Sequence, residues 1–76
     1  MLKEKLVTAA KAHAQAEILK HQTNIDVYLS TVVGIGEHSD IIETIQKELD
    51  AMAAADDRLE MLNKYFTFKD PLKSQG

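Results

Sequence analysis

Apolar side chains recur every three or four residues along two long segments of the chain, which is the spacing of one face of an α-helix. The first segment covers residues 2–33 and the second about residues 39–65, and neither contains Gly or Pro. The pattern therefore predicts two long helices. The positions on the largely apolar face of the first helix, called the first stripe, are Val7, Ala10, Ala14, Ile18, His21, Ile25, Tyr28, Leu29 and Val32. Those of the second helix, called the second stripe, are Ile41, Ile42, Ile45, Leu49, Met52, Ala55, Leu59, Leu62 and Phe66.

The segment between the two helices carries two glycines one residue apart, which predicts a tight turn at residues 34–38. Gly34 follows the predicted end of the first helix, where many helices stop in a left-handed backbone conformation that glycine adopts without steric cost. Ile35 is then placed to contact the preceding helical turn, and Gly36 permits a second bend. A phosphate-binding loop would need a strand before it and a third glycine at the position of Ser39. We therefore expect a hairpin turn here and no phosphate site.

Two short polar signals resemble helix starts. Asp40 followed three residues later by Glu43 resembles a capping box, and acidic side chains there favour the positive end of the helix dipole. Thr23 followed by Asp26 gives a similar signal inside the first helix. Because the first stripe keeps its phase across this point, we expect one continuous helix, with a kink or a restart near Thr23 as the alternative.

A short turn between two long helices makes them antiparallel neighbours, so the predicted fold class is all-α, an antiparallel two-helix hairpin. Positions whose residue numbers sum to about 74 should then face each other. This register brings Glu17 near Arg58 as an exposed ion pair. It also places His21 opposite Met52, one helical turn from Asp56.

The end of the chain does not continue the helical pattern. Pro71 ends any helix that reaches it, and residues 67–76 are expected to form a loosely ordered tail after a hairpin of residues 1–66. Phe68 is the one large apolar side chain near the start of this tail that we expect to fold back onto the hairpin.

A chain of 76 residues forms at most one domain with a small core. The absence of cysteine excludes disulfides and thiolate zinc sites, which leaves oligomerisation as the usual aid to stability. We therefore expect the hairpins to self-associate into a helical bundle. A second, milder apolar face of the first helix, called the outer band, is the expected interface and consists of Leu2, Ala9, Ala12, Ala16, Leu19 and Val27.

The charges argue against nucleic acids as partners and suit the packing of one helix on the other, and the apolar pattern argues against a membrane. The net charge is -3, whereas binding to the phosphates of nucleic acids needs a basic surface. Residues 1–33 carry four basic and three acidic side chains, and residues 34–66 carry three basic and eight acidic ones. No apolar run reaches the roughly 20 residues that cross a bilayer, and the first residues do not resemble a secretory signal. We expect a cytoplasmic protein without nucleic-acid or membrane partners.

The pattern predicts no catalytic residue, no cofactor and no metal ligand. His21 interrupts the first stripe, and the favoured interpretation is a hydrogen-bonded histidine between the two helices. The alternative is a metal-dependent enzyme or metal-binding module that uses His21 with Asp56 and nearby acidic residues. A metal site usually gathers three or more ligands, and only two are evident in the sequence.

The stretch from residue 20 to residue 66 resembles short uncharacterised proteins of tailed bacteriophages that infect marine bacteria, including cyanobacteria. The resemblance lies in NIDVYL at residues 24–29, VGIGEHSDIIE at residues 33–43 and DRLEML at residues 57–62. It implies an accessory or structural role in infection, within the host cytoplasm, and assigns no functional residue. The function expected overall is a non-enzymatic helical homo-oligomer acting as scaffold, adaptor or regulator, with a host or phage protein as a further partner.

Overall fold

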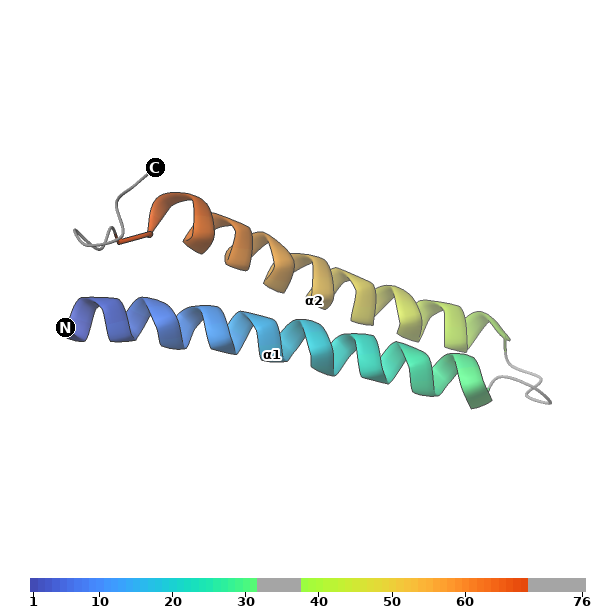
Figure 1. Cartoon of the computed structure of the whole chain (residues 1–76). Coiled ribbons are helices and arrows are strands. Elements are labelled where there is room, and N and C mark those ends of the chain that lie inside the picture. Colours follow the sequence, from blue (N-terminus) through green and yellow to red (C-terminus); the bar gives the residue numbers. More distant parts are fainter. Residues whose placement is uncertain (32–37, 69–76) are drawn as a thin grey trace.

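A computed structural model describes residues 1–31 and 38–68 of the chain. Two helices, α1 (Leu2–Thr31) and α2 (His38–Tyr65), lie side by side and run in opposite directions (Figure 1). The described residues contain no strand. The predicted fold class, an all-α helical hairpin, is therefore confirmed, whereas its assembly into a bundle stays a prediction.

Helix α1 runs without interruption from Leu2 to Thr31. It passes through Thr23 as regular α-helix, so the continuous helix is confirmed and the restart is not found. A mid-helix Thr and Asp cannot end a helix whose apolar face continues to pack on both sides of them. The predicted turn residues Gly34, Ile35 and Gly36 lie outside the described residues, as does the predicted helix end at Val33.

Helix α2 begins at His38, slightly earlier than the predicted start. Asp40 therefore lies inside the first turn of the helix. The hydroxyl group of Thr44, one turn later, donates a hydrogen bond to the backbone oxygen of Asp40 over 2.9 Å. The start predicted at about residue 39 thus agrees closely with the observed start at His38. The electrostatic part of the capping argument holds, because Asp40 in the first turn and Lys64 in the last turn both match the helix dipole.

The core of the hairpin is narrow. Among the described residues only two hydrophobic side chains are fully buried, Ala14 with 2% and Ala55 with 0% of its surface exposed. Because alanine is small, a buried alanine on each helix allows the two helix backbones to approach closely. Other stripe residues are half-buried and several are exposed, so the two stripes cover each other only in part. The exposed members are Ala10, Leu29, Ile42, Leu49 and Phe66.

The two helices diverge from this contact toward Leu2 and Tyr65, which lie at the same end of the molecule (Figure 1). The overall dimensions are 59 × 24 × 16 Å. Beyond Tyr65 the chain leaves the helix, and the Phe68 ring lies 5.9 Å from the Nζ atom of Lys3 at the start of α1. This cation–π contact agrees with the expectation that Phe68 folds back onto the hairpin. Residues 69–76 of the predicted tail at 67–76 lie outside the described residues.

Candidate functional site

One polar cluster lies between the two helices, in the half of the hairpin near Thr31. The Nδ1 atom of His21 and the Oε1 atom of Glu48 are 2.6 Å apart, and their side chains are 14% and 16% exposed. The Nδ2 atom of Asn24 donates a second hydrogen bond to the same oxygen over 3.1 Å. Since a carboxylate can only accept, His21 serves as the donor in this pair. One oxygen of Glu48 thus joins two residues of α1 to α2.

The surroundings of Glu48 favour its charged form. The hydrogen bond from His21 lowers the pKa of the Glu48 carboxyl below its usual value, and the hydrogen bond from Asn24 acts in the same direction. Partial burial opposes the shift but is the weaker influence. The carboxylate is therefore ionised at neutral pH and is a fixed acceptor. A general acid would need the opposite shift, because it must hold its proton near neutral pH.

The sequence predicted the role of His21 but not its partner. A hydrogen-bonded histidine between the helices is what the structure contains. The sequence named no partner for this hydrogen bond and offered Asp56 only in the metal-binding alternative; the partner in the structure is Glu48, one helical turn to the other side of Met52. Glu48 lies three residues after Ile45 and four before Met52, so its spacing already placed it on the second stripe. This spacing could have identified Glu48 as the partner of His21, but an acidic side chain is ordinarily assigned to the solvent-exposed surface.

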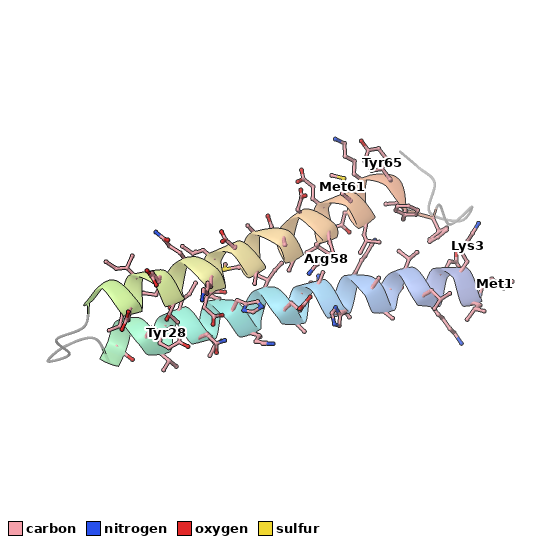
Figure 2. All side chains as sticks on the ribbon, turned by 180° about the vertical axis from the view of Figure 1, so that it is seen from behind. Met1, Lys3, Tyr28, Arg58, Met61 and Tyr65 are labelled. Carbon is pink, nitrogen blue, oxygen red and sulfur yellow. The ribbon has the colours of Figure 1, made fainter. Side chains whose placement is uncertain are left out.

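The structure confirms the predicted contact between Glu17 and Arg58. The Nη2 atom of Arg58 donates to the Oε1 atom of Glu17 over 2.9 Å, and Figure 2 shows Arg58 directed from α2 toward α1. The Nδ1 atom of His13 lies 3.5 Å from the same Glu17 oxygen. Arg58 and Glu17 join the two helices and so mark their register, whereas His13 and Glu17 both belong to α1. Solvent-accessible ion pairs of this kind add little stability.

No group of three or more metal-ligating side chains comes together within residues 1–31 and 38–68. The cluster around Glu48 supplies one imidazole and one carboxylate, and these two are already within hydrogen-bonding distance of each other. The metal-binding alternative, which uses His21 with Asp56 and nearby acidic residues, therefore stays a prediction.

An open groove lies between the diverging parts of the two helices. Its volume is about 470 Å³, and its floor includes the buried Ala14. Apolar side chains form most of its lining, with charged groups at the rim, and Figure 2 shows Arg58 and Met61 along this part of α2. The lining residues are Ala10, His13, Ala14, Asp57, Arg58, Met61 and Leu62.

The outer band predicted as an interface lies on the surface of α1. All six of its side chains are exposed in the single chain, as an interface residue must be before assembly. Its larger members are Leu2, Leu19 and Val27, and the other three are alanines. Nothing in a single chain tests whether this surface is covered by another molecule, so its role stays a prediction.

Comparisons with protein-family models, with characterised proteins and with solved structures give no match for this chain. The resemblance to bacteriophage proteins therefore stays a prediction from the sequence. Within the part of the chain that the structure describes, neither helix has an apolar stretch long enough to cross a membrane.

Proposed function

We propose that this protein is a non-enzymatic, self-associating helical hairpin that acts as a scaffold, adaptor or regulator through contacts with other proteins. The observation that carries this proposal is the imbalance between its core and its surface. Two alanines are the fully buried hydrophobic residues of the described chain, whereas twelve large hydrophobic side chains are exposed. A helical protein with so little buried apolar surface gains stability by packing against another molecule.

The exposed area gives the same result in another measure. The chain exposes 6108 Å² at a mass of 8.5 kDa. A compact monomer of that mass exposes about 4,700 Å², according to the usual scaling of surface with mass. The difference, about 1,400 Å², exceeds the roughly 800 Å² that each partner buries in a stable protein interface. An excess of this size supports a chain that buries part of its surface against another molecule.

The proposed setting is bacteriophage infection, within the cytoplasm of the host. Its support is the resemblance of residues 20–66 to short phage proteins, together with the acidic charge and the helical surfaces described above. In this role self-association builds the scaffold, and the outer band of α1 or the groove beside Met61 is available to a phage or host protein.

Sedimentation equilibrium on the purified chain at tens of micromolar tests the proposal. We expect a mass of at least two subunits that falls toward the monomer on dilution. Circular dichroism at the same concentrations should show helicity that decreases as the assembly dissociates, because the core depends on the interface. A monomer that keeps its helicity and its melting temperature at tens of micromolar would contradict the proposal.

A further inference from the structure

Six apolar side chains from both helices line one side of the hairpin and form a continuous surface, called the side face. Residues seven or eleven positions apart in a helix lie on the same face, two or three turns along. The two helices contribute to the same side, because Ile18 of α1 and Leu49 and Met52 of α2 line one hollow of about 320 Å³. The side face consists of Ile18, Ile25 and Leu29 of α1 and Ile42, Leu49 and Met52 of α2.

These side chains come from the two predicted stripes, yet the hairpin leaves much of their surface in water. Leu29 is 57%, Ile42 56% and Leu49 48% exposed. Ile18, Ile25 and Met52 are half-buried at the edge of the core. A helix in a four-helix bundle uses a face wide enough to contact two neighbours, whereas a hairpin supplies only one. The side face therefore has the width and position of a bundle core that lacks its other half.

The charges beside the side face differ between the two helices. Lys11 lies seven residues before Ile18, so it continues the face along α1 toward the diverging end of the hairpin. Asp56 and Glu60 lie seven and eleven residues after Leu49, so they continue it along α2 toward the same end. Asp56 also lines the hollow formed by the side face. The face thus ends in a cation on α1 and in carboxylates on α2.

We propose, on the basis of the self-association proposed above, that a second copy of this chain packs against the side face with both hairpins pointing in the same direction. A two-fold axis parallel to the helices then places α1 of each copy against α2 of the other. This arrangement pairs apolar with apolar side chains at the Thr31 end and sets Lys11 beside the partner's Asp56 and the partner's Glu60. The opposite direction would bury these carboxylates against Leu29 and Ile42, which is unfavourable. The outer band stays outside this interface.

Two aspartate substitutions, measured by sedimentation equilibrium, distinguish the faces. Leu49→Asp lies on the side face and should raise the dissociation constant of the dimer at least tenfold. Leu19→Asp is the matched control, since it introduces the same charge at an exposed leucine of the outer band, and it should leave the constant within twofold. If the wild-type chain and the Leu49→Asp variant are dimers and the Leu19→Asp variant is a monomer, the side face is not the interface, although the chain self-associates. A monomeric wild-type chain would refute both proposals.

Charge reversal tests the same interface without altering its apolar side chains. Lys11→Glu should weaken the dimer, and adding Glu60→Lys to the same chain should restore most of the affinity, while both variants keep their helicity at concentrations at which they are dimeric. An absence of restoration would overturn the proposed pairing of α1 with α2.

The direction of the two copies is tested by cross-linking, for which the cysteine-free chain is well suited. Chains carrying Leu29→Cys are mixed with chains carrying Ile42→Cys and oxidised. The proposed arrangement predicts a disulfide-linked dimer that contains one chain of each kind. A dimer by sedimentation that yields no mixed disulfide would overturn the direction.

Discussion

The two buried alanines, Ala14 of α1 and Ala55 of α2, lead to a prediction about helix packing. Replacing Ala14 with leucine inserts three carbon atoms at a side chain that is only 2% exposed. Overpacking of this kind usually costs about 1–3 kcal/mol. The total stability of a chain of this size is about 4–11 kcal/mol, so the loss is a large share of it. The expected fall in melting temperature is about 4–8 °C for each kcal/mol lost.

Ala10 provides a matched control, because it lies one turn earlier on the same helix and lines the open groove. Ala10→Leu adds the same three carbon atoms to a space of about 470 Å³ and should leave stability unchanged or raise it. Urea unfolding followed by circular dichroism, at one protein concentration for all variants, measures both changes. If Ala14→Leu and Ala10→Leu differ by less than about 0.5 kcal/mol, the two buried alanines do not form the closest contact between the helices.

Three further predictions concern the polar side chains. The pKa of Glu48 is lowered in the folded chain, so the stability that its carboxylate contributes is fully present above the unfolded-state pKa near 4.5. This stability is lost as the pH falls through the folded-state pKa. Glu48→Gln should therefore reduce the fall in melting temperature between pH 6 and pH 3. Arg58→Ala should change the free energy of unfolding by less than about 0.5 kcal/mol, because the ion pair of Arg58 with Glu17 is accessible to solvent. A larger loss of stability would show that Arg58 also holds the helices together. Calorimetric titration with zinc, manganese or magnesium should give no saturable binding, whereas a single site abolished by His21→Ala would establish the metal-binding alternative.

The helices were predictable because their signals repeat along the whole length of each element. A stripe that keeps its phase for more than seven helical turns outweighs a local signal such as Thr23 with Asp26. The contact between Glu17 and Arg58 followed from the register alone, which depends only on where the chain reverses. Features that are averaged over many residues were therefore available from the sequence.

The extent of the core and the partner of His21 were not predictable in this way. A periodic pattern tells which side chains share a face, but not how wide a strip of that face a single neighbouring helix covers. Leu49 and Leu29 belong to the stripes but lie toward the side of the hairpin, so they are exposed. Glu48 was missed because a charged residue on a stripe is ordinarily solvated, and its two donors on α1 become evident only once the helices are placed side by side.

The arrangement of contacts along the hairpin also defines an order of folding. The contact between Asn24 and Glu48 closes a loop of 24 residues, whereas that between Glu17 and Arg58 spans 41. The entropic free-energy cost of closing the longer loop is greater by about 0.5 kcal/mol. The contact of Lys3 with Phe68 closes a longer loop still. The hairpin should therefore zip from the Thr31 end, form its contact at Lys3 last and fray there first. Within the two helices, we expect the backbone amides near Lys3 to exchange their hydrogens fastest and the part of the hairpin that holds the groove beside Met61 to open most often.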